Sequence, residues 1–399
     1  MSVVREVYAD HASTTRVADE VRAAMEPYWG SAFGNASSVH ARGEAARDAM
    51  ELARARVAEL IGALPEEIVF TASGTEANNL ALKGAARALA SGTRRRIVVS
   101  AIEHPSVLET ARHLEARGHP LTIVPVEASG VVDPGRLADS LGEDTALVSV
   151  MWVNNEVGTI QPIRAIAAAA HAAGALVHVD AVQAAGKLPI AVREEAVDLL
   201  SLAGHKFGGP LGAAALFVRR RLRLVPLLHG GHQERSRRAG TENLPAIVGL
   251  GAAAERAVRR IAAGEPARLG ALGRRLRAGL AASCPGSLNG DPERRLETIV
   301  NWCFRGLDGE AMLHELDRQG IAVSTGSACS AATPGPSHVL TAMGLAARDA
   351  HASVRFSLGE GNDEADVDWI LEAAPGAVAR LRALESPAAE REGTARRGA

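Results

Sequence analysis

Short apolar segments that alternate with helical stretches run through the first two thirds of the chain, and they constrain the fold more than any other feature. The apolar segments span Ile97–Ser100, Thr122–Val126, Ala146–Val153, Ala175–Asp180, Leu199–Ala203 and Ala213–Val218. Apolar residues at helical spacing occupy Gly43–Gly62, Thr75–Ala90 and Ile163–Ala173. Continuously apolar strands that alternate with helices are typical of a parallel sheet covered on both faces. We therefore predict an α/β domain around a largely parallel sheet.

The last third of the chain mixes strands and helices differently. Helical patterns cover Ala246–Ala263, Arg268–Ala282, Gly309–Gln319 and Glu364–Leu384, and strand patterns cover Glu297–Phe304 and Ser353–Ser357. This mixture predicts a smaller α+β domain. We place the large domain at residues 16–260, the small domain at residues 1–15 together with 261–386, and a disordered polar tail at 387–399.

Composition and charge exclude several classes of protein. A formal net charge of −2 over 399 residues lacks the basic excess of a protein that binds nucleic acid over its whole surface. The chain has no apolar run long enough for a transmembrane helix, and Met1–Asp10 lacks the apolar stretch of a signal peptide, so we expect a cytoplasmic protein. The cysteines Cys284, Cys303 and Cys329 form no CxxC pair, which predicts neither a metal site nor a disulfide framework.

Two segments end or follow apolar strands and carry polar groups. The turn Thr71–Glu76 opens a helix, and N–H groups at a helix start suit a phosphate, although an ordinary capped helix explains the turn better when it is taken alone. Asp180 ends a buried strand at the edge of the sheet where ligands bind. Its position fits a ligand contact and a helix cap about equally well.

Lysine is scarce, which narrows the search for a catalytic amine. Of the three lysines, Lys206 follows an apolar strand and precedes a glycine-rich turn, a setting that suits Schiff-base chemistry. Lys83 lies within a helix and Lys187 at a strand start, and a surface or snorkelling role is the better interpretation for both. A phosphate cradle, an acid for a ring nitrogen and a lysine for an aldehyde are together the parts of a pyridoxal-phosphate site.

Ten short motifs between Tyr8 and Asp368 are specific enough to indicate a family. They are Asp10–Thr15, Phe33–Asn35, Ser73–Asn79, Glu103-His104, Val153–Gly158, His178–Asp180, Gly204–Lys206, Gly240–Asn243, Ser327–Cys329 and Val354–Phe356. Together they resemble the NifS/IscS-type cysteine desulfurases, which belong to the class V aminotransferase group of the fold-type I pyridoxal-phosphate enzymes. The resemblance covers nearly the whole chain, and it implies a mostly parallel seven-stranded sheet in the large domain.

The resemblance implies a role for each matching residue. Lys206 is expected to bind the aldehyde of pyridoxal 5′-phosphate and then to act as the base at Cα, Asp180 to keep the pyridine nitrogen protonated, and His104 to stack on the ring and move protons at sulfur. Further cofactor contacts are expected from Gly74, Thr75, Asn155, Gln183 and His205, and from Thr241 of the neighbouring subunit of a homodimer. Arg355 is expected to bind the substrate carboxylate bidentately, with Asn35 and Asn155 beside it.

Cys329 lies in Ser324–His338, a small, polar and proline-rich segment that is typical of a mobile loop. Cys303 lies in a strand pattern and Cys284 at a helix end, so only Cys329 can travel between a buried cofactor and an outside acceptor. The resemblance implies that L-cysteine loses its sulfur to the Cys329 thiolate, forming a persulfide and L-alanine, and that the persulfide passes to a protein acceptor.

Several questions stay open at this point. A selenocysteine lyase or another class V enzyme would use the same cofactor site, a catalytically silent scaffold would keep the fold alone, and the acceptor could serve iron–sulfur assembly, tRNA or DNA thio-modification, or a biosynthetic carrier. The chain also departs from the family at Ala72-Ser73-Gly74-Thr75 and at Ala203, where many members have a serine that reaches the phosphate. One lost neutral hydrogen bond costs about 0.5–1.5 kcal/mol, so we expect weaker cofactor binding at most.

Overall fold

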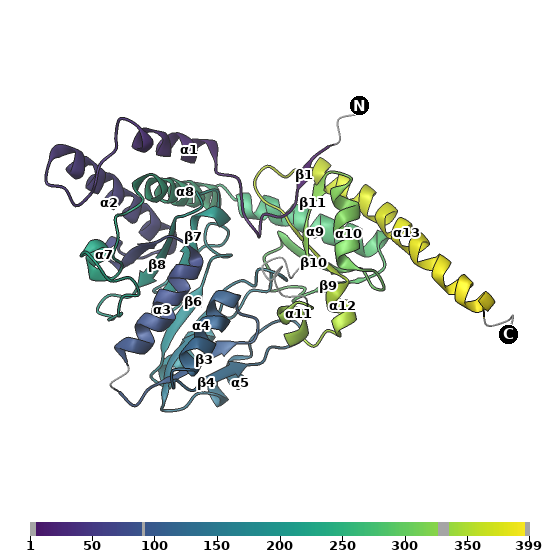
Figure 1. The fold of residues 1–399 in the computed structure, drawn as a ribbon, viewed down its shortest axis with the longest axis horizontal. Coiled ribbons are helices and arrows are strands. Elements are labelled where there is room, and N and C mark those ends of the chain that lie inside the picture. Colours follow the sequence, from purple (N-terminus) through teal and green to yellow (C-terminus); the bar gives the residue numbers. More distant parts are fainter. Residues whose placement is uncertain (1–4, 90–91, 326–334, 396–399) are drawn as a thin grey trace.

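The computed structural model describes residues 5–89, 92–325 and 335–395, with no side chains described beyond residue 384 (Figure 1). Cys329, the predicted sulfur carrier, lies outside the described residues. Within the described ranges, no helix is long and apolar enough to span a membrane.

A seven-stranded sheet forms the centre of the larger part of the molecule. Its strand order is β2-β8-β7-β6-β5-β3-β4, and β8 alone runs antiparallel to its neighbours. The strands are β2 (Ile68–Thr71), β3 (Arg96–Ser100), β4 (Leu121–Val124), β5 (Thr145–Ser149), β6 (Leu176–Asp180), β7 (Leu199–Ala203) and β8 (Ala214–Val218). The predicted mostly parallel seven-stranded sheet is therefore confirmed.

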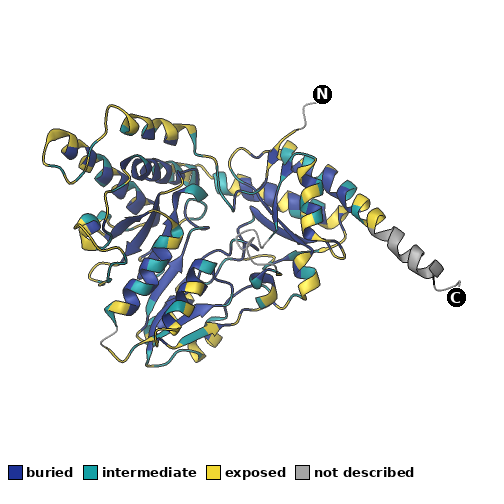
Figure 2. Ribbon diagram, viewed as in Figure 1, coloured by how far each residue is buried: buried dark blue, intermediate teal, exposed yellow. Residues whose placement is uncertain are grey.

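Helices cover both faces of this sheet because its strands are apolar on both sides (Figure 2). Val98 and Val148 pack on one face together with α2, α6 and α8, whereas Val99 and Leu147 pack on the other with α3 and α4. The helices of this part are α1 (Asp19–Met25), α2 (Ala41–Ile61), α3 (Gly74–Ala88), α4 (Pro105–Glu115), α5 (Pro134–Asp139), α6 (Ile163–Ala172), α7 (Gln233–Ser236) and α8 (Leu244–Ala262).

A second sheet with its own apolar core lies in the last third of the chain. Its order is β12-β13-β10-β9, all antiparallel, and the first strand of the chain, β1, pairs in parallel with β11 beside it. The strands are β1 (Val7–Tyr8), β9 (Ser287–Asn289), β10 (Ile299–Cys303), β11 (Ile321–Ala322), β12 (Ser324–Thr325) and β13 (Ser353–Ser357). The helices are α9 (Glu265–Ser283), α10 (Gly309–Asp317), α11 (His338–Ala342), α12 (Ala347–His351) and α13 (Glu364–Ala395). The division into two domains at residue 260 stays a prediction.

The C-terminal helix is longer than the sequence pattern indicated. A disordered tail was expected from Pro387 onward, but α13 continues to Ala395 and projects away from the rest of the chain (Figure 1). The expectation of a disordered tail from residue 387 onward stays a prediction.

The strand directions bring the predicted site residues to one edge of the large sheet. Six of the seven strands are parallel, so their carboxyl ends, including those of β2, β3, β5, β6 and β7, lie at the same edge. The chain leaves these ends at Thr71, Ser100, Ser149, Asp180 and Ala203. Each predicted cofactor residue except Thr241 sits at one of these ends or in the segment that directly follows it.

Candidate active site

Lys206 ends the short 3₁₀ turn Gly204–Lys206, which directly follows β7. Its Nζ donates to the carbonyl oxygens of Ala12, at 2.7 Å, and Ser13, at 2.6 Å. The same N-terminal segment is fastened to the lysine turn by Thr15, whose Oγ1 donates to His205 O (2.9 Å) and accepts from Gly208 N (2.9 Å). A segment at the start of the chain therefore holds the amine predicted to do the chemistry.

Asp180 is a buried carboxylate at the end of β6, only 5% exposed. Its Oδ2 accepts from Asn78 Nδ2 at 2.7 Å, and its Oδ1 accepts from Val182 N at 3.0 Å. Asn78 also donates to Ser106 Oγ at 2.8 Å, so one amide joins α3, β6 and α4. Sequence reasoning quoted Asn78 within a motif but did not assign it this role, which depends on three separate elements meeting.

His104 is the N-cap of α4, and its ring is oriented by the first turn of that helix. Nδ1 accepts from the backbone N–H of Ser106 at 3.1 Å and lies 2.8 Å from Ser106 Oγ. Burial lowers the pKa of His104 below its usual value, with Asp180 acting in the opposite direction and Lys206 adding to the decrease. The neutral ring therefore carries its proton on Nε2, since Nδ1 is an acceptor.

The start of α3 has the form of an anion cradle. Ser73 Oγ accepts from Glu76 N at 3.1 Å, and Glu76 Oε2 accepts from Ala72 N at 2.8 Å, so the cap is satisfied internally. The N–H groups of Gly74 and Thr75 belong to the first turn and have no intrahelical partner. A Cβ on Gly74 would lie 2.9 Å from Val182 Cγ2, which leaves space only for glycine.

Arg355, the residue predicted to bind the substrate carboxylate, makes hydrogen bonds to other residues in this structure. Arg355 lies on β13, is 2% exposed, and donates from Nη2 to Asp10 Oδ1 and Ser13 Oγ, both at 2.7 Å. Its Nη1 donates to the carbonyl oxygen of Asn155 at 2.9 Å. Arg355 thus lies beside the N-terminal segment that also contacts Lys206, and its Nε has no partner among the described residues.

Asn35 and Thr241 stand apart from these residues within one chain. Both are exposed, and Asn35 Oδ1 accepts only a local hydrogen bond from Ser37 N (2.8 Å) among the described contacts. Asn35 lines a surface cavity together with Glu242, the residue after Thr241. The structure therefore places Asn35 beside the Thr241 segment rather than beside Lys206.

Lys187 is a residue whose position sequence reasoning misjudged. It is half-buried rather than exposed, and its Nζ donates to Gln183 Oε1 at 2.7 Å. Gln183 Nε2 in turn donates to Ala12 O at 2.8 Å, the same carbonyl that Lys206 contacts. Burial first, and then the charges of Lys206 and Arg355, together lower the pKa of Lys187 to about 7. Lys187 lies in a turn after β6 rather than at a strand start, and the expected surface or snorkelling role stays a prediction.

Two buried acids lie next to predicted site residues. Burial raises the pKa of Glu103 to about 8, although its Oε1 accepts from Ser100 Oγ (2.5 Å) and Met151 N (2.8 Å). Burial likewise raises the pKa of Glu156 to about 7, and this residue accepts from Ser337 Oγ at 2.5 Å. Both acids belong to motifs identified in the sequence, but the rise in their pKa values follows only from burial.

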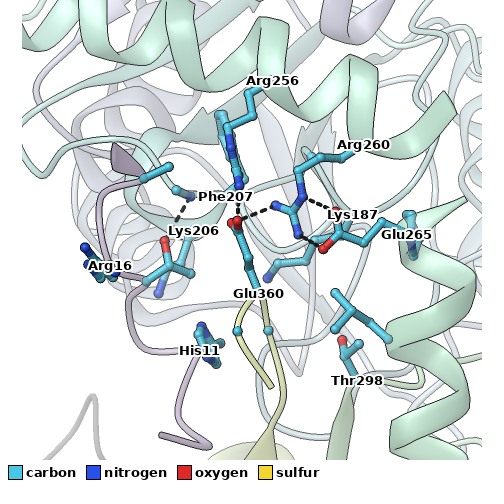
Figure 3. Close-up of a pocket in the computed structure, with 18 of the residues that line it drawn as sticks. His11, Arg16, Lys187, Lys206, Phe207, Arg256, Arg260, Glu265, Thr298 and Glu360 are labelled. Carbon is cyan, nitrogen blue, oxygen red and sulfur yellow. Dashed lines mark hydrogen bonds and ion pairs between the residues drawn. The ribbon is translucent and has the colours of Figure 1, made fainter. Parts of the chain in front are cut away.

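A cavity of about 460 Å³ is lined by Lys206 and Lys187 together with residues of α8 and α9 (Figure 3). His11 and Thr298 line it, and a network of Arg256, Arg260, Glu265 and Glu360 stands at one side. Asp180, His104 and Arg355 do not line this cavity. Lys206 nevertheless lies close enough to His104 for its charge to lower the pKa of that ring.

Comparison with known proteins gives consistent matches over nearly the whole chain. The family described as aminotransferase class-V matches residues 7–370. A cysteine desulfurase of Gluconacetobacter diazotrophicus is 46% identical over 381 residues, covering 95% of this chain and 94% of that protein. The cysteine desulfurase IscS of Methanosarcina thermophila is 45% identical over 388 residues, covering 97% and 95%.

Solved structures agree with these relatives. A NifS-like protein superposes with a TM-score of 0.89 at 37% identity and covers 94% of this chain and 100% of that chain. SspA in complex with cysteine superposes with a TM-score of 0.78 at 36% identity, covering 88% and 98%. DndA from Streptomyces lividans gives 0.75 at 38% identity, covering 88% and 99%.

Proposed function

The chain belongs to the class V aminotransferase family, and from that premise we propose that it is a cysteine desulfurase that uses pyridoxal 5′-phosphate. It converts L-cysteine to L-alanine and leaves the sulfur as a persulfide on Cys329. The observation that carries the proposal is that one edge of the sheet brings together an amine, Lys206, a buried carboxylate, Asp180, and a neutral imidazole, His104. Relatives about 45% identical over nearly the full length support the same activity.

The residues at this edge fit the cofactor. A phosphate suits the unpaired N–H groups of Gly74 and Thr75, where the helix dipole is also favourable. A protonated ring nitrogen suits Asp180, because a buried carboxylate is costly without a cation nearby. Lys206 follows β7 at the same sheet edge, and its amine donates to two backbone carbonyl oxygens. This amine is suited to bind the cofactor aldehyde. When bound, the cofactor supplies an electron sink for the charge that develops at Cα.

The chain's own residues divide the remaining work. Lys206 takes the Cα proton once its amine is neutral, a state that neighbouring positive charge favours. Arg355 binds the substrate carboxylate by exchanging it for Asp10 and Ser13, the acceptors that it contacts in this structure. His104, whose Nδ1 is engaged by Ser106, holds or moves a proton at Nε2 close to the substrate sulfur.

The sulfur transfer balances without an added oxidant. The Cβ–S bond of L-cysteine breaks, and an S–S bond forms between the substrate sulfur and the Cys329 thiolate. The substrate carbon skeleton takes up the electron pair and protons and leaves as L-alanine, while the two sulfur atoms share the oxidation as a persulfide. A thiolate is the reactive form, so deprotonation of Cys329 is part of the step.

We also propose that the active enzyme is a homodimer and that a protein accepts the persulfide sulfur. Asn35 and the Thr241 segment are exposed together on one surface, as expected of residues that complete the site of a second subunit. The relatives carry names from more than one sulfur-transfer system, IscS, NifS-like and DndA. An acceptor for iron–sulfur assembly or for tRNA or DNA thio-modification is consistent with that range.

The test measures sulfide and alanine together. Purified protein is incubated with L-cysteine and a thiol reductant, and the wild type is compared with Cys329→Ala and with Cys303→Ala, a matched control because Cys303 is buried in β10. Equal amounts of both products from the wild type and Cys303→Ala, with almost none from a Cys329→Ala variant that retains the cofactor colour, support the proposal.

Other outcomes contradict parts of it. Full activity of Cys329→Ala rejects the persulfide and favours a lyase that acts directly on its substrate. Selenide release from selenocysteine without sulfide release from cysteine identifies a selenocysteine lyase. A colourless protein that does not take up pyridoxal 5′-phosphate indicates a silent scaffold.

A further inference from the structure

A chain of three hydrogen bonds links Lys187 to Lys206. Lys187 Nζ donates to Gln183 Oε1 (2.7 Å), Gln183 Nε2 donates to Ala12 O (2.8 Å), and Lys206 Nζ donates to the same Ala12 O (2.7 Å). We propose that Lys187 is a positioning residue of the active site, whose ammonium group fixes the amide of Gln183 and, through Ala12, the amine of Lys206. This inference rests on the function proposed above, because it assigns Lys187 a part in the same site.

The direction of the Gln183 amide follows from its two neighbours. An amide has one acceptor end and one donor end. Lys187 in its ammonium form can only donate, and Ala12 O can only accept. A flipped amide would point its NH₂ at the Lys187 ammonium and its oxygen at the Ala12 carbonyl, two repulsive contacts. One Nε2 hydrogen binds Ala12 O, so the second can make the cofactor contact that the family resemblance implies for Gln183.

Local sequence spacing explains how Lys187 reaches Gln183. The chain makes helical turns after β6, with Lys187 N donating to Ala184 O at 3.0 Å. Residues four apart lie on the same side of such a turn, which brings the Lys187 stem over the Gln183 amide. The contact with Ala12 is not local, because Ala12 lies 171 residues before Gln183.

Lys187 lies near other positively charged side chains. Its pKa is lowered to about 7 by burial first and then by Lys206 and Arg355. Its own charge contributes to the lowered pKa of His11 and of His205, each about 4 and due first to burial. A charged Lys187 therefore favours the neutral form of the nearby Lys206 amine.

The acidic groups near Lys187 are already paired. Glu360 and Glu265, across the cavity of about 460 Å³, form ion pairs with Arg260, and Glu360 also pairs with Arg256 (Figure 3). Lys187 lines this cavity, whereas Asp180 and His104 do not.

The experiment compares Lys187→Met, Lys187→Arg and the control Lys83→Met as refolded or cofactor-stripped full-length protein reloaded with pyridoxal 5′-phosphate. Lys83 lies on α3 and donates to Asn79 Oδ1 at 2.6 Å, and among the described residues it has no hydrogen bond to Gln183 or Ala12. Two quantities are measured, the dissociation constant of pyridoxal 5′-phosphate and the midpoint of the absorbance–pH titration of the cofactor joined to Lys206.

We expect Lys187→Met to weaken cofactor binding by about tenfold, the effect of losing one hydrogen bond from a charged donor. The titration midpoint should move to higher pH, because a positive neighbour is removed. Lys187→Arg should retain both values near the wild type, and Lys83→Met should match the wild type. In a Gln183→Leu background, Lys187→Met should weaken binding little further, since Lys187 acts through Gln183.

The proposal is overturned if Lys187→Met leaves both quantities unchanged, or if it weakens binding equally in the Gln183→Leu background. If Lys187→Met does not fold, Lys187→Gln takes its place, because it keeps a donor but removes the charge. An unchanged titration midpoint in Lys187→Gln then rejects the electrostatic part. A wild type that never forms the Lys206-dependent absorbance contradicts the proposed function instead, so the two failures are distinguishable.

Discussion

Substitution of Glu103 by glutamine should remove a large pH dependence from the stability of this protein. Glu103 precedes His104, is fully buried, and has a pKa raised to about 8 by burial, while hydrogen bonds from Ser100 and Met151 act weakly in the opposite direction. Near neutral pH the folded state therefore keeps a proton on this carboxyl that the unfolded chain has already released. Glutamine reproduces the neutral shape of the group and its acceptor Oε1 without titrating.

The magnitude follows from the pKa difference. A carboxyl whose pKa rises from 4.5 to about 8 on folding favours the folded state most below pH 4.5, and this contribution is lost as the pH rises through 8. Within that window the loss is about 1.4 kcal/mol per pH unit, so the wild type should lose about 3 kcal/mol between pH 5 and pH 7 from this group. Glu103→Gln should lose none of it.

The assay is chemical unfolding followed by tryptophan fluorescence at pH 5, 6 and 7 for the wild type, Glu103→Gln and the control Glu115→Gln. Glu115 is an exposed residue at the end of the neighbouring helix α4. The difference between the variant and the wild type isolates Glu103, because other titrating acids such as Glu156 are present in both proteins. At pH 5 the two proteins should be within about 1 kcal/mol of each other.

A stability difference that does not change between pH 5 and pH 7 would refute the reasoning, since it would mean that Glu103 is ionised in both states. An equal change of stability with pH for Glu115→Gln would also refute the reasoning, because the change would then not depend on the burial of Glu103. A difference that grows with pH in favour of Glu103→Gln is the expected result.

Three further predictions concern other parts of the chain. Arg54 Nη1 and Nη2 each donate to the buried Glu234 carboxylate at 2.8 Å. Arg54→Met leaves this carboxylate without its cation, so it should lower the free energy of unfolding in urea by about 3–5 kcal/mol. A loss below about 1 kcal/mol would contradict this. Gly74→Ala should weaken pyridoxal-phosphate binding by about tenfold because its Cβ meets Val182 Cγ2 at 2.9 Å, and a second substitution, Val182→Ala, should restore binding; no rescue would show that the contact is not the cause. Arg355→Lys should raise KM for L-cysteine by about tenfold or more with a smaller change in kcat, because lysine cannot form the planar bidentate contact; an unchanged KM would remove Arg355 from the substrate site.

The strands of the large sheet were predictable because their signal is local. The segment Leu199–Ala203 has the same bounds in the sequence pattern and in the structure. The strands β2, β5, β7 and β8 are buried at every position and mostly apolar, as a sheet covered on both faces requires. The reversed direction of β8 and the order of the seven strands were not predictable, since they depend on which strands meet after the chain has crossed the sheet.

The residue types of the candidate site and their places after strands were predictable, because these are also local features. Lys206, Asp180 and His104 were identified because their residue types, their positions after strands and their motif neighbours are written in the chain. Asn78, which bonds to Asp180, was quoted but given no role, because an asparagine in a helix motif does not reveal which carboxylate it will face. Sequence reasoning also expected Lys187 at the surface, the usual place of a lysine.

The sequence by itself determined the local chemistry of this protein: the strands and helices, and the nucleophiles, acids and bases available. Only the tertiary structure decided how these groups behave. Lys206 contacts Ala12 across 194 residues of chain, and Glu103 and Lys187 change their proton affinities because distant segments remove water from around them. Periodicity and residue type are local properties, whereas burial and charge–charge distance arise only when remote segments pack together.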